Sequence, residues 1–246
     1  MPANVAVIIP ARYGSTRFPG KPLHPIGGKP LIQHVWERAS RAKGIGSVIV
    51  ATDDIRIAET AFDFGAEVSM TSPKHVSGTD RCAEVARRLK DVSHVINVQG
   101  DEPLVDPALI GRLARTLLSQ PKLAMVTAAN AFAPEEDVSQ PNAVKVVLDR
   151  AGDALYFSRS PIPFVRDGSA VSPGYLRHQG IYGYTKRFLL QFVKWKPGRL
   201  ECCEQLEQLR ALENGTRIRV LVTKGVSVGV DSPEDVGVAE KLLGVR

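Results

Sequence analysis

A glycine-rich loop near the start of the chain combines backbone amides with basic side chains. It spans Arg12 to Pro22 and carries the cations Arg12, Arg17 and Lys21. Backbone N–H groups of such a loop can surround a phosphate, and arginine and lysine can neutralise its charge. Pro22 follows Lys21, where a Walker A loop has a serine or threonine that holds magnesium. The loop therefore indicates a different kind of phosphate site, with a solvent-exposed basic loop as the alternative interpretation.

Two aspartates stand at points where a carboxylate could hold a cation. Asp101 comes shortly after an apolar run, and Asp231 comes just before Ser232 and Pro233, which are typical of a helix start. Carboxylate oxygens suit Mg²⁺ held between triphosphate oxygens, and two of them on one cation suit phosphoryl chemistry. A helix-cap role for Asp101 and a turn role for Asp231 are the alternatives.

Polar groups that could bind the rest of a substrate lie in other segments. Ser77–Arg81 could cap a helix, or could offer hydroxyl and amide groups to a nucleobase. His178 lies among polar and small residues, where a hydrogen-bonded core role is the simpler interpretation. Glu201, Glu204 and Glu207 recur at helical spacing and would share one face. That face could bind sugar hydroxyls or simply meet solvent.

The first half of the chain alternates strand-like and helix-like segments. Apolar β-branched runs predict buried strands, and amphipathic segments between them predict helices. The predicted strands are 5–9, 47–52 and 94–98, and the predicted helices are 31–42, 55–64, 77–89 and 107–118. This alternation predicts a parallel sheet with helices on both faces. Ligands bind beyond the carboxyl ends of such strands, so residues 10–12, 52–53 and 99–101 should face one crevice.

The second half is less regular. Its predicted strands are 143–148, 179–184 and 218–222, its predicted helix is 200–214, and a last helix should begin at an N-cap residue, Ser232. The run 167–174 is rich in glycine, serine and proline, and we expect a mobile loop there. No linker is evident, so residues 1–246 should form a single domain with a lobe inserted at about 130–215.

Composition excludes several classes of protein. The chain has 246 residues, of which 43% are hydrophobic and 24% charged, as in ordinary globular proteins. The net charge of +6 is spread along the chain and aromatic residues make up 6%, so we expect no nucleic-acid partner. No apolar run approaches the roughly 20 residues of a membrane span, so we expect a cytoplasmic protein without a membrane partner. The 3 cysteines predict no disulfide framework, and we expect them to be small buried side chains.

Taken together, the motifs resemble those of one enzyme family. They are Ile9–Leu23, 51–53, 77–81, 97–103, 141–147, 156–159, 177–184, 200–210 and 229–235. In this order they resemble the 3-deoxy-manno-octulosonate cytidylyltransferases, the CMP-Kdo synthetases of Gram-negative bacteria. The resemblance covers essentially the whole chain. It departs from the family pattern at Val226-Ser227-Val228 and at the double cysteine 202–203.

The resemblance implies a fold, a reaction and partners. The fold would be the Rossmann-like three-layer α/β fold of nucleotide-diphospho-sugar transferases, with a mostly parallel central sheet. CTP and Kdo (3-deoxy-D-manno-octulosonate) would give CMP-Kdo and pyrophosphate with Mg²⁺, for lipopolysaccharide biosynthesis. The chain would form a homodimer, and the lobe at about 130–215 would serve sugar binding and dimerisation. Another acidic sugar, such as 8-amino-Kdo or a sialate, is the alternative substrate, and a nucleotide-sensing module without turnover is the alternative class.

The resemblance also implies roles for individual residues. The catalytic residues would be Arg12, Lys21, Asp101 and Asp231, of which the two aspartates would hold magnesium. The nucleotide would meet Ala11, Arg12, Arg17, Lys21, Ser77, Gly78, Thr79 and Arg81. The sugar would meet Gln99, Arg159, His178, Tyr182, Glu201, Glu204 and Glu207. We expect the planar guanidinium of Arg159 to match the sugar carboxylate.

Overall fold

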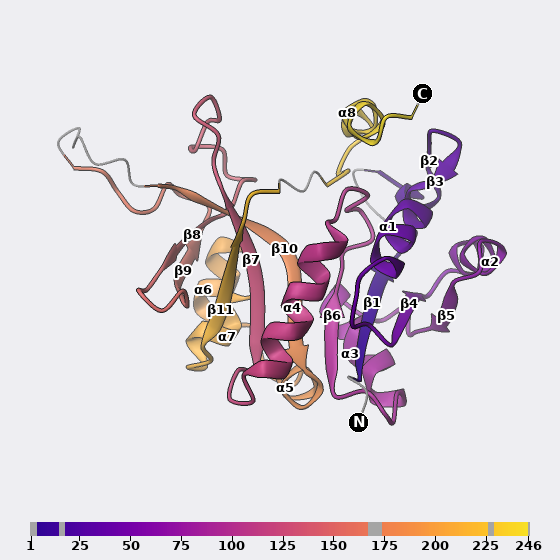
Figure 1. Cartoon of the computed structure of the whole chain (residues 1–246), viewed down its shortest axis with the longest axis horizontal. Helices are drawn as coiled ribbons and strands as arrows, with labels where there is room; N and C mark the ends of the chain where they lie inside the picture. Colours follow the sequence, from indigo (N-terminus) through magenta and orange to yellow (C-terminus); the bar gives the residue numbers. More distant parts are fainter. Residues whose placement is uncertain (1–3, 15–17, 167–173, 226–228, 246) are drawn as a thin grey trace.

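The computed structural model describes residues 4–14, 18–166, 174–225 and 229–245. In this part of the chain, a 9-stranded sheet contains the path β11-β7-β10-β6-β1-β4-β5, with β8 and β9 joined to β10 through β8. Figure 1 shows α4 crossing in front of the sheet. The described residues include no helix that is both long and apolar enough to cross a membrane.

The parallel half of the sheet is built around a fully buried strand. β1 (Val5–Ala11) pairs in parallel with β4 (Ser47–Thr52) and β6 (His94–Asn97), and β4 pairs in parallel with β5 (Glu67–Met70). The intervening helices are α1 (Leu31–Ser40), α2 (Ile55–Asp63), α3 (Gly78–Arg88) and α4 (Pro107–Ser119). The predicted strands, helices and parallel pairing of the first half are therefore confirmed.

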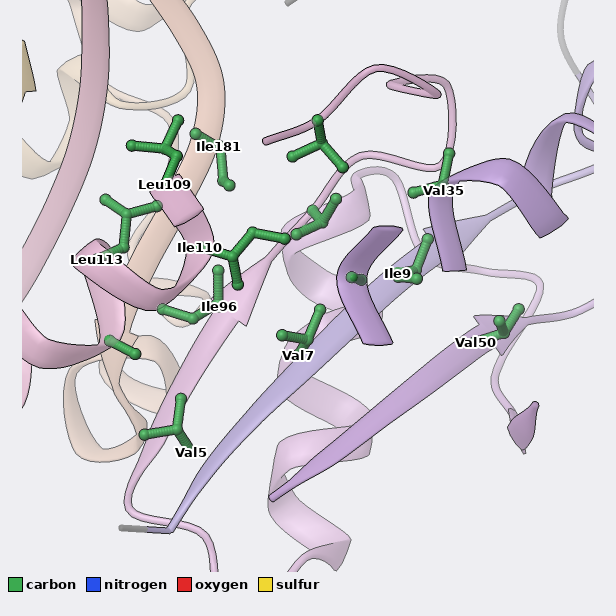
Figure 2. Close-up of a cluster of buried hydrophobic side chains, with 14 of the residues drawn as sticks. Val5, Val7, Ile9, Val35, Val50, Ile96, Leu109, Ile110, Leu113 and Ile181 are labelled. Carbon is green, nitrogen blue, oxygen red and sulfur yellow. The ribbon is translucent and has the colours of Figure 1, made fainter. Parts of the chain in front are cut away.

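Alternate residues of β1 point into two separate cores. Val5, Val7 and Ile9 belong to a cluster that includes side chains of α1, α2 and α4, whereas Ile8 belongs to a second cluster on the other side, with α3. Figure 2 shows the first cluster, where Val7 and Ile9 lie among side chains of neighbouring strands and helices. Because side chains alternate along a strand, the continuous apolar run of β1 fills both faces. The result is a helix–sheet–helix arrangement of three layers.

The second half of the chain enters the same sheet. β10 (Leu176–Thr185) lies between β6 and β7 (Met125–Ala131) and is antiparallel to both, while β11 (Ile218–Thr223) is parallel to β7. β8 (Lys145–Leu148) and β9 (Ala154–Ser158) form an antiparallel extension from β10. The region 130–215 therefore contributes both this extension and a central strand, and the predicted single domain with an inserted lobe stays a prediction.

The predicted helix 200–214 is wrong, because the chain forms two short helices there. α6 (Arg199–Glu204) ends where Gln205 adopts a left-handed conformation with φ of 52°, and α7 (Leu209–Glu213) follows. The break places Glu207 between the helices, so the glutamates do not share one helical face. Cys202 and Cys203 are exposed on α6, which corrects the expectation that all the cysteines are buried; Cys82 is buried as expected. The short α5 (Lys186–Phe192) packs into the second core.

The last helix returns to the beginning of the chain. α8 (Glu234–Leu243) packs with Phe18, Ile26 and Leu31 in a third apolar cluster. Figure 1 shows α8 beside the hairpin of β2 (Pro25–Ile26) and β3 (Lys29–Pro30). The helix begins one residue later than predicted, because Pro233 is its N-cap and Ser232 lies before it.

Candidate active site

A cavity of about 290 Å³ opens at the carboxyl edge of the parallel strands. Its lining comes from the end of β1, the loop after β6, the loop before α3, the glycine-rich loop and the segment before α8. The lining residues are Pro10, Ala11, Arg12, Lys21, Pro22, His75, Val76, Ser77, Gly78, Arg81, Gln99, Gly100, Asp101 and Asp231. The structure thus brings together the predicted catalytic residues Arg12, Lys21, Asp101 and Asp231, which lie far apart in the sequence.

The centre of the site is a lysine between two carboxylates. Lys21 Nζ lies 2.6 Å from Asp101 Oδ2 and 3.3 Å from Asp231 Oδ1. The Lys21 side chain is 13% exposed, that of Asp101 31% and that of Asp231 57%, so the group faces the cavity from a partly buried position. Lys21 begins the short 3-10 helix η1 (Lys21–Leu23), which follows Gly20 in a left-handed conformation with φ of 72°. That φ is easily reached only by glycine.

These residues fit a divalent cation that a triphosphate brings with it. The Lys21 ammonium contacts the carboxylates of both Asp101 and Asp231, so one positive charge between them interacts with both. A divalent cation placed there could be bound by both carboxylates in the same way. Mg²⁺ is usually held by one or two carboxylates together with phosphate oxygens and water. Among the described residues no group of 3 or more histidine, cysteine, aspartate or glutamate side chains forms a complete protein site for a metal. The donor set therefore suits a metal that arrives on phosphates.

Bare backbone forms part of the cavity wall. A Cβ built on Gly100 would lie 2.8 Å from the carbonyl oxygen of Pro10, which is closer than a side chain tolerates. A Cβ on Gly78 would lie 3.1 Å from the Pro10 ring. Because these glycines carry no side chain, the loop after β6 and the start of α3 approach the end of β1 closely. A flat ligand such as a nucleobase can then reach backbone amides and carbonyls.

The start of α3 is capped by Ser77, which is one of the two interpretations that the sequence left open, and it is anchored by Arg81. Ser77 is the N-cap, and its Oγ accepts a hydrogen bond of 3.1 Å from the backbone N–H of Asp80. Arg81 is buried, donates to the hydroxyl of Thr71 and lies 3.2 Å from a carboxylate oxygen of Asp53. This pairing holds the first turn of α3 against the end of β4. Arg12, by contrast, is exposed and has no hydrogen bond or ion pair with another described residue.

Three of the predicted sugar contacts, Glu207, His178 and Tyr182, contact other side chains of the protein and do not line the cavity. The hydroxyl of Thr79 donates to the Glu207 carboxylate, and burial raises the pKa of Glu207. His178 Nε2 lies 3.0 Å from the hydroxyl of Thr127, and its ring packs against Phe157 and Tyr182. Desolvation lowers the pKa of His178 to about 3, and desolvation raises the pKa of Tyr182. His178 is therefore neutral at ordinary pH.

Other predicted sugar contacts are engaged within the protein. The Arg159 guanidinium donates to the backbone oxygens of Glu204, Pro141 and Gln205 at 2.6, 3.0 and 3.2 Å. The Glu204 carboxylate accepts from the hydroxyl of Ser158 and the backbone N–H of Arg159. Glu201 forms an ion pair with Arg210 at 2.5 Å. Of the predicted sugar residues, Gln99 lines the cavity described above, whereas Arg159, His178, Tyr182, Glu201, Glu204 and Glu207 do not.

Two expectations concern residues that the structure does not describe. The expected nucleotide contact Arg17 is one of these residues, and the expected mobile loop 167–174 is described only at its last residue.

Sequence reasoning missed His75 and Val76, which line the cavity. His75 Nε2 lies 2.5 Å from Glu84 Oε2, and the same carboxylate oxygen accepts from the backbone N–H of Ser72 at 2.9 Å. The hydrogen bond from Ser72 is the main cause of a lowered pKa at Glu84. The signal was available, because His75 stands two residues before the Ser77–Arg81 motif.

The parallel strands, the cavity at their carboxyl edge and the cations around it define a nucleotide-binding α/β protein. Comparison with known sequences narrows this class. The sequence model of the cytidylyltransferase family matches residues 6–218, and the chain belongs to that family.

Individual relatives match almost the whole chain. A 3-deoxy-manno-octulosonate cytidylyltransferase of Geobacter sulfurreducens is 50% identical over 249 residues, covering 98% of each protein. An 8-amino-3,8-dideoxy-manno-octulosonate cytidylyltransferase of Shewanella sp. (strain W3-18-1) is 50% identical over 243 residues, again covering 98% of each. A solved structure of CMP:2-keto-3-deoxy-manno-octonic acid synthetase complexed with CTP has a TM-score of 0.93 at 40% identity, covering 98% of this chain and 99% of that one. These similarities confirm the predicted family and three-layer fold.

Proposed function

We propose that this chain transfers the cytidylyl group of CTP to Kdo and releases pyrophosphate, a step of lipopolysaccharide biosynthesis. The observation that carries the proposal is the position of Lys21 between Asp101 and Asp231, at 2.6 and 3.3 Å, on the wall of the cavity. Cations and carboxylates at one point suit a phosphate chain with its metal. The names of the relatives supply the base and the sugar acid.

In the proposed reaction, the anomeric hydroxyl of Kdo attacks the α-phosphorus of CTP. A bond forms between this hydroxyl oxygen and phosphorus, the bond from the α-phosphorus to the α–β bridging oxygen breaks, and pyrophosphate leaves; the hydroxyl proton passes to solvent. Negative charge grows on the leaving group, and we propose that Lys21 and Arg12, which line the cavity, neutralise it. Asp101 and Asp231 would hold Mg²⁺, which supplies Lewis-acid stabilisation of the phosphate oxygens.

Most of the other predicted nucleotide contacts line the cavity, where a cytidine could contact the backbone of the protein. Ala11, Ser77 and Gly78 line the cavity, and Gly100 leaves room beside them. We propose that these groups, with Arg81 holding the start of α3 in place, read the base. Thr79 and Arg17 stay in the proposed nucleotide set from the family resemblance.

For the sugar acid, we propose Gln99 on the cavity wall together with Glu207, His178 and Tyr182, which do not line the cavity. Arg159, Glu201 and Glu204 stay proposed sugar contacts from the resemblance. Arg159 binds backbone oxygens of residues 141, 204 and 205, so a carboxylate would have to share its guanidinium with them. Arg159→Lys should then impair the use of Kdo and leave CTP affinity nearly unchanged, as separate titrations of the two ligands can show.

A second acidic sugar has a specific observation in its favour. The Shewanella relative named for 8-amino-3,8-dideoxy-manno-octulosonate is as similar to this chain, at 50% identity, as the Geobacter relative named for Kdo. The direct test is a pyrophosphate-release assay with CTP, Mg²⁺ and Kdo, its 8-amino analogue or a sialate. We expect Kdo to have the highest kcat/KM. Preference for the 8-amino sugar selects the alternative, and CTP binding without turnover of any sugar points to a nucleotide sensor.

We also propose that the chain works in the cytoplasm as a homodimer. Leu155 is 62% exposed and Phe164 is 85% exposed, both within the region 130–215. Exposed large apolar side chains are typical of protein interfaces when they gather in a patch. Light scattering should give a dimer for the wild type and a monomer for Phe164→Asp. A monomeric wild-type chain at micromolar concentration contradicts the proposal.

A further inference from the structure

The carboxylate of Asp231 is exposed, yet it meets a partly buried lysine. Its side chain is 57% exposed and stands in the connection to α8. An exposed side chain on a connecting segment loses conformational entropy when it is held in one place. Something in the surrounding structure must therefore fix the backbone at this position.

One anchor is buried and lies on the inner side of the connection. Val230 is fully buried in the third apolar cluster, together with Phe18, Ile26 and Ala239. Its backbone N–H donates a hydrogen bond of 2.9 Å to the backbone oxygen of Asp101. The segment that carries Asp231 is thus tied directly to the segment that carries Asp101.

A second anchor is the carboxylate of Asp235 in the first turn of α8. Its Oδ2 accepts hydrogen bonds from the backbone N–H of Asp231 at 2.9 Å and from the backbone N–H of Ser232 at 2.8 Å. The hydroxyl of Ser232 donates to the same oxygen at 3.1 Å. One carboxylate oxygen therefore accepts from the two backbone N–H groups that flank the Cα of Asp231.

This arrangement adds one hydrogen bond to the pattern of a capping box. In a capping box, an acid at the third helical position reaches back to the backbone N–H of the N-cap residue. Asp235 accepts the backbone N–H of Ser232, three residues before it, as the acid of that box does. The bond from the backbone N–H of Asp231 is additional and reaches one residue further back. These bonds order the connection before α8 and leave the helix amides to other partners.

We propose that Asp235 is a positioning residue, which holds the backbone of Asp231 so that its carboxylate shares a divalent cation with Asp101. The proposal rests on the proposed function in one respect, namely that the cation arrives with a nucleoside triphosphate. It does not depend on which sugar acid is the acceptor. Groups that orient metal-binding side chains typically change metal affinity by about 10- to 100-fold when they are removed.

The test is metal binding by the whole chain in three variants. Asp235→Ala removes the acceptor, Asp235→Asn keeps an oxygen in its place, and Glu234→Ala removes an equal charge from the same turn of α8. Binding of Mn²⁺ in the presence of CTP is followed by the electron paramagnetic resonance signal of free Mn²⁺. Thermal unfolding and CTP binding without metal are measured in parallel.

We expect Asp235→Ala to weaken Mn²⁺ binding by about tenfold or more, with metal-free CTP binding unchanged. Asp235→Asn should recover most of the affinity, and Glu234→Ala should match the wild type. Unchanged Mn²⁺ affinity in folded Asp235→Ala, or an equal loss in Glu234→Ala, overturns the proposal. If Asp235→Ala does not fold, Ser232→Ala decides, because a positioning role predicts that it weakens Mn²⁺ binding more than Glu234→Ala does. A wild type that binds Mn²⁺ with CTP but does not turn over Kdo contradicts the proposed function alone, whereas one that binds no Mn²⁺ contradicts both.

Discussion

At the scale of single residues, the site centres on Lys21, which contacts two carboxylates at once. Its ammonium neutralises Asp101 and Asp231, which would otherwise repel each other across the cavity. Under the proposed function, a cation that arrives with a triphosphate would give the two carboxylates another partner, and Lys21 would then contact phosphate oxygens. Residue type and spacing made Lys21 and Asp101 predictable, because an aspartate after a buried strand and a lysine in the loop after another strand belong to one edge of a parallel sheet. The place of Asp231 beside them followed only from the family resemblance.

Lys21→Ala should lower kcat more than it weakens CTP binding. The leaving pyrophosphate gains charge in the transition state, so a cation placed there acts mainly on the rate. Loss of one such donor costs about 10²-fold or more in kcat. Steady-state rates beside calorimetry of CTP binding separate the two effects. An unchanged kcat with a much higher KM would mean that Lys21 supplies only ground-state binding.

His178 predicts an acid sensitivity of the fold. Desolvation lowers its pKa to about 3 in the folded chain, below the unfolded value of about 6.5. Between these values the unfolded chain binds more protons, so stability is complete above pH 6.5 and falls as the pH decreases toward 3. His178→Gln keeps a polar partner for Thr127 and removes the titration. Urea unfolding should show that the wild type loses about 1–2 kcal/mol more than this variant between pH 7.5 and pH 5. Equal losses in the two chains would rule out His178 as the cause.

At the scale of elements, sequence patterns predicted the strands that carry apolar β-branched runs and missed several strands that lack one. β7 is buried at all but its last residue, yet its sequence is largely alanine, threonine and asparagine and gives little strand signal. β1 and β4 are apolar runs, and their positions follow from that pattern alone. β5 is a strand at the end of the sheet with exposed or half-buried residues, so it has little apolar signal. The helix 200–214 was predicted from glutamate spacing, but that spacing does not encode the left-handed Gln205. Consequently Glu201 and Glu204 were assigned with Glu207, although they have different partners.

Gln205 allows a direct test of the break between α6 and α7. Its φ of 52° is tolerated by glycine and costs about 1–2 kcal/mol for a side chain that clashes with the following carbonyl. Gln205→Val should therefore lower the free energy of unfolding by about that amount, because a β-branched residue fits this conformation worst. Gln205→Gly should unfold at the wild-type temperature or above. A thermal scan in which valine is tolerated as well as glycine would argue for a continuous helix.

At the scale of the whole molecule, the site is assembled from distant parts of one chain. Lys21 and Asp101 are 80 positions apart, and Lys21 and Asp231 are 210 apart. The parallel strands bring the first two together, and the packing of α8 on Phe18, Ile26 and Leu31 brings the third. Strand order alone predicted that Lys21 and Asp101 lie close together. Strand order could not predict that Asp231 joins them, because the sequence pattern of α8 does not indicate which surface of the protein the helix packs on.

The central claim is that Asp101 and Asp231 hold a cation on CTP while its α-phosphate is transferred to a sugar acid. The measurement that tests it most directly is pyrophosphate release from CTP and Kdo by Asp101→Asn, with unfolding monitored beside it. This change removes one charge and almost no volume, so the chain should fold normally. We expect the rate to fall by about 10³-fold or more, because a ligand charge is lost where transition-state charge develops. A folded Asp101→Asn chain with near-normal kcat would falsify the account.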